Sequence, residues 1–265
     1  MVSTDSETQT GQAARPAEGL FIDDGGTGGT PVLFVHSAAG STEHFAAQLA
    51  HLRKKRRAVA LDLRGHGRSA PPPDGDYTIA ALAADVVAVA DRLGLERFVL
   101  VGHSLGGAVA AEVVGRNPER VAGLVLLDPA SDARGLPEAE KQGLLAAVES
   151  GDWRSTVEAY WGSMLGGSSE SVREFLLQGL RATRKDAVVE PLKALLFHDA
   201  ITPLSRYSGP KLSLITALNE IPTAYHAQDP GLRHRKIEGT GHWLALDDPK
   251  AVNRAIDDFL AEARL

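Results

Sequence analysis

The chain has 265 residues, of which 43% are hydrophobic and 23% charged, a composition typical of a globular protein with a sizeable core. The formal net charge is −6, and basic side chains form no run apart from residues 53–57, which argues against a nucleic-acid-binding protein. The sequence contains no cysteine, so disulfides, a thiol nucleophile and thiolate metal sites are excluded. No apolar run is long enough to span a membrane and no secretory pattern opens the sequence, so we expect a cytoplasmic protein.

The first half of the chain alternates strand-like and helix-like segments. Residues 1–18 are polar, and we expect them to form a flexible tail. Thr78 is predicted to cap a helix over residues 79–93. The predicted strands are 20–22, 31–35, 58–61, 98–101 and 124–127. The first of them is expected to be an edge strand that ends in a turn at 23–26. Such alternation is typical of a mostly parallel sheet covered by helices on both faces, an α/β fold.

The alternation stops after residue 129, and the sequence then reads as helices only. One helical stripe contains Val157, Tyr160, Trp161, Met164 and Leu165. Two further strands and a last helix follow at 212–215, 234–237 and 249–263. The helical block is too long for a simple connection between two strands. We therefore interpret residues 131–209 as a helical cap over the ligand-binding edge of the sheet, and residues 19–130 and 210–265 as the core.

A serine between two glycines follows the apolar run 98–101, in the sequence Gly-His-Ser-Leu-Gly-Gly at 102–107. This spacing fits a sharp strand-to-helix turn, in which residues without a Cβ let two backbones pass closely. The turn would hold the Ser104 hydroxyl at the carboxyl edge of the sheet, above the unpaired N–H groups of the next helix. Those groups face an oxyanion formed on an attacked carbonyl. Ser104 is therefore the predicted nucleophile.

Four motifs at predicted strand ends carry a family resemblance. They are V-H-S-A-A-G at 35–40, D-L-R-G-H-G-R-S at 62–69, G-H-S-L-G-G at 102–107 and G-T-G-H-W at 239–243. Together, and in this order, they resemble the α/β-hydrolase fold family from about residue 19 to the C-terminus. The resemblance implies a mostly parallel sheet flanked by helices, an inserted helical cap and a serine hydrolase that uses neither a cofactor nor a metal.

A serine hydroxyl needs an adjacent base to become a nucleophile. The resemblance implies that His242 is this base and that the N–H groups of Leu105 and Ala38 form the oxyanion hole. Ser37 stands where the family usually has a glycine. Three interpretations are open: the loop accommodates the serine without change, the serine hydroxyl adds a donor to the oxyanion hole, or the serine displaces the loop and with it Ala38.

The carboxylate that completes the triad has two candidates at strand ends. Glu220 follows the strand at 212–216 and matches the usual family position, so it is preferred. Asp128 ends the preceding strand, a position that a minority of families use, and its simpler interpretation is a structural aspartate before Pro129.

The substrate pocket is predicted to involve His103, Tyr160, Trp161 and Trp243. The cap has no excess of basic residues, so the preferred substrate is a small, mainly apolar carboxylic ester or lactone, cleaved through an acyl-enzyme. A serine nucleophile argues against dehalogenase and epoxide-hydrolase chemistry. The alternatives are a carbon–carbon bond hydrolase, a cofactor-free perhydrolase, or a ligand receptor with the same fold. The expected partner is thus a small molecule and neither nucleic acid nor a membrane, and no oligomeric state is predicted.

Overall fold

The computed structural model describes residues 18–265, so the predicted tail lies, except for Glu18, outside the described residues. Seven strands form one sheet in the order β1-β3-β2-β4-β5-β6-β7. All neighbouring strands are parallel except β1 and β3, which are antiparallel. The strands are β1 (Ile22–Gly25), β2 (Val32–Val35), β3 (Ala58–Leu61), β4 (Phe98–His103), β5 (Val121–Leu127), β6 (Lys211–Ile215) and β7 (Arg233–Lys236).

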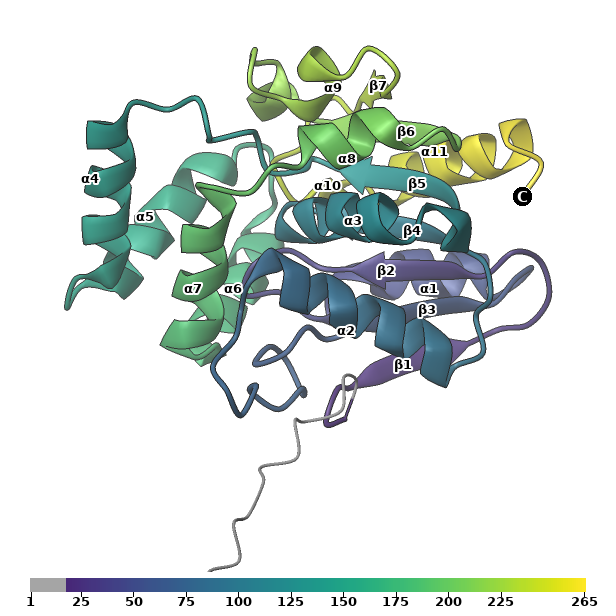
Figure 1. Ribbon diagram of the computed structural model, residues 1–265, viewed down its shortest axis with the longest axis horizontal. Helices are drawn as coiled ribbons and strands as arrows, with labels where there is room; N and C mark the ends of the chain where they lie inside the picture. The colour runs from purple at the N-terminus through teal and green to yellow at the C-terminus, as the bar shows by residue number, and fades with distance from the viewer. Residues whose placement is uncertain (1–17) are drawn as a thin grey trace, which may run out of the picture.

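The central strands are buried on both faces, as their unbroken apolar runs predict. Alternate residues of β2 belong to two different cores: Leu33 and Val35 to one, Val32 and Phe34 to the other. The first core is covered by α2 (Ile79–Arg92), α3 (Leu105–Arg116) and α8 (Ile201–Arg206), and the second by α1 (Ala46–Leu52) and α11 (Pro249–Glu262). This three-layer arrangement is visible in Figure 1.

The first strand differs from its prediction, because β1 includes Asp23 and Asp24, which were expected in a turn. Pairing with β3 extends this segment, and the two carboxylates lie beside the basic run. Arg53 bonds Asp23 at 2.7 Å and Arg57 bonds Asp24 at 2.7 Å. The basic run therefore fixes the edge strand to the sheet.

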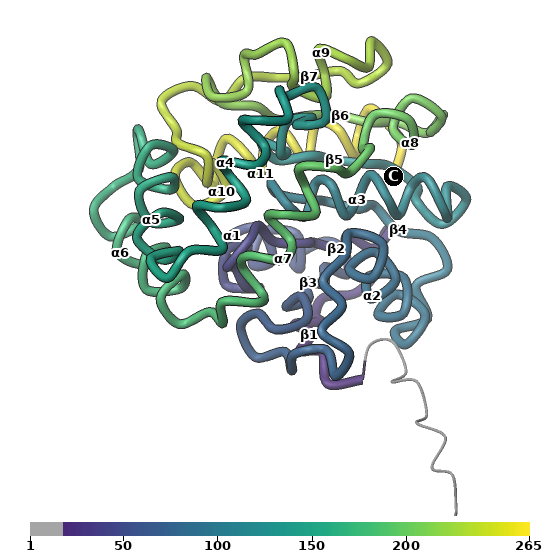
Figure 2. The backbone as a smooth tube through the Cα atoms, turned by 60° about the vertical axis from the view of Figure 1, so that its left-hand side comes forward, coloured from purple at the N-terminus to yellow at the C-terminus, as the bar shows by residue number. Residues whose placement is uncertain are grey.

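Four helices form an insertion between β5 and β6: α4 (Glu138–Glu149), α5 (Trp153–Met164), α6 (Glu170–Ala182) and α7 (Lys185–Leu195). They gather at the end of the sheet toward which the arrows of the parallel strands point in Figure 1, and Figure 2 shows them grouped together from another side. Their shared core includes Trp153, Val157, Trp161 and Leu180, and it also takes in Trp243 from the sheet side. The insertion is thus packed onto the rest of the protein through Trp243.

Helix α8 falls inside the predicted cap range 131–209, but it packs against α3 on the sheet. The buried side chain of Leu204 and the bond from the Tyr207 hydroxyl to the Val121 carbonyl, 3.0 Å long, hold it there. The remaining short elements are η1 (Thr42–Phe45), η2 (Pro118–Arg120), η3 (Ala217–Asn219), α9 (Tyr225–Gln228) and α10 (Leu244–Asp247). Within residues 18–265, no helix has the length and apolar character that a bilayer crossing requires.

Candidate active site

Ser104 lies in the turn between β4 and α3, with φ 53° and ψ −114°. A positive φ strains any residue other than glycine and marks functional turns. The neighbouring glycines are sterically required: a Cβ on Gly102 would meet the Gly106 carbonyl, and a Cβ on Gly106 would meet the Val35 carbonyl. The sharp turn predicted from the Gly-x-Ser-x-Gly pattern is present, and it places Ser104 at the carboxyl edge of the sheet.

His242 and Asp128 form a buried pair. His242 Nδ1 lies 2.7 Å from Asp128 Oδ2, and the Asp128 side chain is fully buried. The same carboxylate accepts the Thr216 N–H at 2.7 Å and the Thr216 hydroxyl at 3.0 Å. An ionised carboxylate is an acceptor only, so it accepts a hydrogen bond from Nδ1–H, and the other ring nitrogen, Nε2, is left to accept a proton.

Glu220 does not reach His242, which corrects the preference for Glu220 over Asp128 as its partner. Its exposed carboxylate pairs with Lys236 at 2.9 Å. After β6 the chain turns through η3, and this turn carries Glu220 away from the edge where β4 and β5 end. Thr216, which no sequence motif marks, is the residue of this segment that contacts the His242–Asp128 pair.

Ser104, His242 and Asp128 all line one cavity of about 500 Å³ between the strand ends and the inserted helices. Among residues 18–265 no hydrogen bond joins the Ser104 hydroxyl to the imidazole, and such bonds often tighten only when substrate is bound. The cavity wall from the insertion is mainly apolar and includes Leu144, Val148, Val157, Tyr160, Trp161, Met164 and Leu192. The loop after β6 adds Leu218, Asn219 and Ile221.

Three of the four predicted pocket residues, Tyr160, Trp161 and Trp243, line this cavity. The rings of Trp161 and Trp243 pack edge to face with centroids 4.9 Å apart. His103 is absent from the cavity lining and is buried, which corrects its predicted role in substrate binding. Its Nε2–H donates to the His242 carbonyl at 2.9 Å, so it supports the loop that carries the base.

The loop after β2 is fixed by His36. The ring accepts the Leu63 N–H at Nε2, 2.9 Å away, and donates from Nδ1–H to the Ser37 carbonyl at 2.7 Å. Burial lowers the pKa of His36 to about 3, so the ring is neutral near pH 7. The Gly40 N–H donates to the same Ser37 carbonyl at 3.0 Å. The backbone at Ser37 is therefore held in one conformation.

The two predicted oxyanion donors lie on either side of the nucleophile. Ala38 follows the fixed loop and lines the cavity, and Leu105 is the first residue of α3. Within the described part of the chain, neither N–H donates a backbone hydrogen bond. Both N–H groups thus lack a backbone partner, and of the two residues Ala38 lines the cavity.

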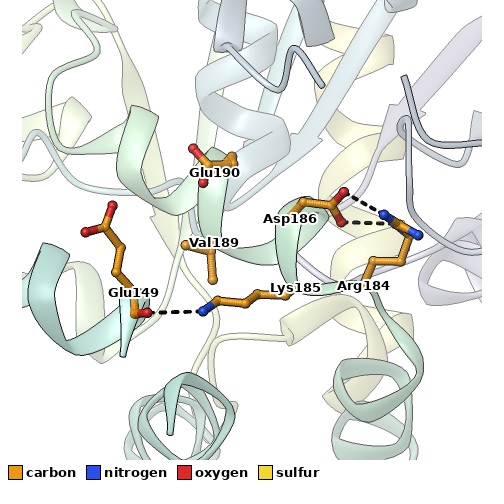
Figure 3. A pocket seen from close by; sticks show the side chains of 6 residues that line it. All are labelled: Glu149, Arg184, Lys185, Asp186, Val189 and Glu190. Carbon is orange, nitrogen blue, oxygen red and sulfur yellow. Dashed lines mark hydrogen bonds and ion pairs between the residues drawn. The ribbon is translucent and has the colours of Figure 1, made fainter. Parts of the chain in front are cut away.

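A second hollow is lined by the last residue of α4 and by the beginning of α7 (Figure 3). Its charged side chains are already engaged with neighbours: Arg184 pairs with Asp186 at 2.9 Å, and Lys185 bonds the Glu149 carbonyl at 3.1 Å. Nowhere in residues 18–265 do three or more metal-ligating His, Asp or Glu side chains gather in a group that could hold an ion. The predicted serine, histidine and carboxylate line the cavity at Ser104 and not this hollow.

The chain matches known proteins over most of its length. A dihydrolipoyllysine-residue acetyltransferase component of the acetoin cleaving system from Pseudomonas putida is 30% identical over 251 residues, which cover 91% of this chain and 66% of that protein. The chain thus spans slightly less than two thirds of that relative's length.

Two solved structures have similar folds. An esterase from Thermogutta terrifontis superposes with a TM-score of 0.81 at 26% identity, covering 93% of this chain and 94% of that one. Est816, described as an N-acyl homoserine lactone degrading enzyme, gives a TM-score of 0.78 at 25% identity, with 91% and 96% covered. The family model for the alpha/beta hydrolase fold matches residues 30–249. As the motifs at the strand ends predict, the chain belongs to the alpha/beta hydrolase fold family.

Proposed function

We propose that the protein is a serine hydrolase that cleaves carboxylic esters or lactones of small, mainly apolar substrates through an acyl-enzyme. The observation that carries this proposal is that a strained Ser104 lines the same cavity as the buried His242–Asp128 pair. A mainly apolar cavity wall favours an uncharged substrate. Similarity to an esterase and to a lactone-degrading enzyme supports the same class of reaction.

In the proposed reaction, Ser104 Oγ attacks the substrate carbonyl carbon while its proton moves to His242 Nε2. Asp128 accepts the hydrogen bond from Nδ1–H and stabilises the imidazolium. The N–H groups of Leu105 and Ala38 bind the oxyanion. The tetrahedral intermediate then expels the alcohol, which takes the proton from His242. Water hydrolyses the acyl-enzyme by the same steps in reverse order.

Covalent trapping tests this proposal. A fluorophosphonate probe should attach to the protein in a one-to-one ratio, and mass spectrometry of its peptides should find the adduct on Ser104. A panel of 4-nitrophenyl esters and lactones should show turnover. In the Ser104→Ala variant, which lacks only the hydroxyl, both labelling and turnover should disappear. A wild-type protein that binds the probe reversibly and turns over no member of the panel would instead fit a ligand receptor.

Trp161 is expected to control substrate preference. Because it lines the cavity and packs on Trp243 beside the base, Trp161→Ala should enlarge the acyl pocket. We expect the ratio of kcat/KM between long and short acyl esters to change by about 10-fold. Labelling of Ser104 by a small phosphonate should stay near the wild-type rate.

Trp153→Ala is the matched control, because Trp153 belongs to the same hydrophobic cluster but does not line the cavity. It should lower the melting temperature without changing the preference between acyl chains. If both variants lose activity equally toward every ester and toward the probe, Trp161 acts through the fold and not through the pocket.

A further inference from the structure

The turn between α5 and α6 lies against the loop that carries His242. We call residues 165–169 the insertion turn and residues 239–243 the base loop. The His242 N–H donates to the carbonyl of Met164, the last residue of α5, at 3.0 Å. Arg173 of α6 closes the insertion turn, because its guanidinium donates to two carbonyls of the turn, at 2.7 and 3.1 Å. The backbone of His242 is therefore bonded directly to the insertion.

Glycines on both sides let the insertion turn and the base loop approach closely. A Cβ on Gly167 would lie 2.6 Å from the Gly239 carbonyl oxygen, and a Cβ on Gly241 would lie 2.7 Å from the Gly166 carbonyl oxygen. Both distances are shorter than a carbon–oxygen contact allows, so a side chain at either position would push the two segments apart.

Asp247 joins the same two segments through its side chain. Its Oδ2 accepts the N–H of Gly241, which precedes the base, at 2.8 Å, and the Ser168 hydroxyl of the insertion turn at 3.1 Å. Its Oδ1 is buried without a partner among the described residues, and burial raises the pKa of the carboxyl group. Burying part of a carboxylate costs free energy, whereas an ionised acceptor forms stronger hydrogen bonds than a neutral one. The carboxylate thus occupies an unfavourable environment in which it ties the base loop to the insertion.

We propose that the insertion turn positions the catalytic base, with Asp247 as the positioning residue that couples the two. This inference rests on the proposed hydrolase function. Two consecutive N–H groups, of Gly241 and His242, bond Asp247 and Met164, so they fix the backbone from which the imidazole extends. A displacement of about 1 Å in a catalytic group can lower a rate about 100-fold. The insertion must therefore be seated on the base loop for Ser104 to react.

The first variant, Asp247→Ala, removes the acceptor from both donors. It should lower kcat for a 4-nitrophenyl ester about 10- to 100-fold and leave KM within about twofold, because neither Asp247 nor Ser168 lines the cavity. The low-field proton NMR signal of His242 Nδ1–H, which reports the bond to Asp128, should shift or broaden. Asp247→Asn keeps an acceptor oxygen of the same shape, so it should restore most of kcat and the signal.

The second variant, Gly167→Ala, disturbs the contact from the insertion side and leaves Asp247 in place. Its Cβ would push the insertion turn away from the Gly239 carbonyl, so kcat and the NMR signal should change as in Asp247→Ala. Gly166→Ala is the matched control, because a Cβ there meets no atom within 4 Å and the residue has no positive φ. It should keep kcat within about twofold of the wild type.

Asp248→Ala is the matched control for Asp247→Ala. Asp248 caps α11 by accepting the Ala251 N–H at 2.9 Å, and its side chain bonds neither the base loop nor the insertion turn. Loss of this cap should lower the melting temperature, while kcat stays within about twofold of the wild type and the NMR signal is unchanged.

Three results would overturn the inference. They are wild-type kcat in a folded Asp247→Ala or Gly167→Ala protein, a loss of kcat with an unchanged NMR signal, and losses of kcat that follow the melting temperature alike in these variants and in Asp248→Ala. If Asp247→Ala does not fold, Gly167→Ala decides alone. Failure of the hydrolase proposal would show instead as a wild-type protein with neither turnover nor labelling of Ser104.

Discussion

Changing Asp128 to asparagine is expected to lower kcat for ester hydrolysis by about 10⁴-fold. Asparagine would present an N–H group to His242 Nδ1, which now lies 2.7 Å from a carboxylate oxygen. The imidazole would then carry its proton on Nε2, where it cannot accept the proton of Ser104. Steady-state kinetics with a 4-nitrophenyl ester measures this loss, and KM should change little because asparagine has nearly the same shape and volume as aspartate.

Glu220→Gln is the control for this prediction. The Glu220 carboxylate is exposed and pairs with Lys236, so its neutralisation should leave kcat within about twofold of the wild type. Because Asp128 also holds Thr216, both variants need a melting curve to separate folding from catalysis. The opposite result, a large loss in Glu220→Gln and a mere loss of stability in Asp128→Asn, would return the acid to Glu220.

Lowering the pH from 7 to 5 is expected to cost the protein several kcal/mol of unfolding free energy. Burial lowers the pKa of His36 and His66 to about 3 and that of His44 to about 4, from the usual 6.5. The folded protein therefore keeps these rings neutral, whereas the unfolded chain protonates them below pH 6.5. The contribution of each ring to the free energy of unfolding is therefore fully present above pH 6.5 and is lost as the pH falls toward 3–4. By pH 5 the loss is about 2 kcal/mol per ring.

Urea unfolding at pH 7, 6 and 5 tests this prediction. The variant His44→Leu removes a buried ring whose Nδ1 has no partner among the described residues. In this variant, unfolding below pH 6.5 should take up about one proton fewer, so the free energy of unfolding should fall less steeply with pH. If the free energy of unfolding stays constant between pH 7 and pH 5, the folded protein binds protons at these histidines as readily as the unfolded chain does, and the prediction is wrong.

Local patterns in the sequence predict most of the fold. Thr78 caps α2 through a bond from the Ala81 N–H, 3.2 Å long, and the last helix begins at Pro249 as predicted. The serine turn is predicted as well, because a steric conflict between neighbouring backbones makes its glycines necessary. Each of these features depends on residues close in the chain, so the spacing of residue types is enough to identify it.

The acid and the role of His103 depend on which strand ends lie together, and spacing along the chain does not contain this information. In the sheet, β5 lies between β4 and β6, so Asp128 emerges next to the end of the strand that carries Ser104. His103 directly precedes the nucleophile, yet its side chain packs under the His242 loop and not in the cavity. Only the three-dimensional structure shows that Ser104 lines the cavity and that its neighbour His103 does not.

With the proposed acid at the end of β5, the part of the loop after β6 that lies beyond Thr216 supplies no residue of the proposed triad. Leu218 and Ile221 in that loop line the cavity and are 42% and 39% exposed, while Asn219 anchors it through a bond to the Pro129 carbonyl, 3.0 Å long. Substitutions at Leu218 and Ile221 can therefore reshape the cavity without touching Ser104, His242 or Asp128. This loop is where new substrate preferences can evolve, or be selected in the laboratory, at the least risk to turnover.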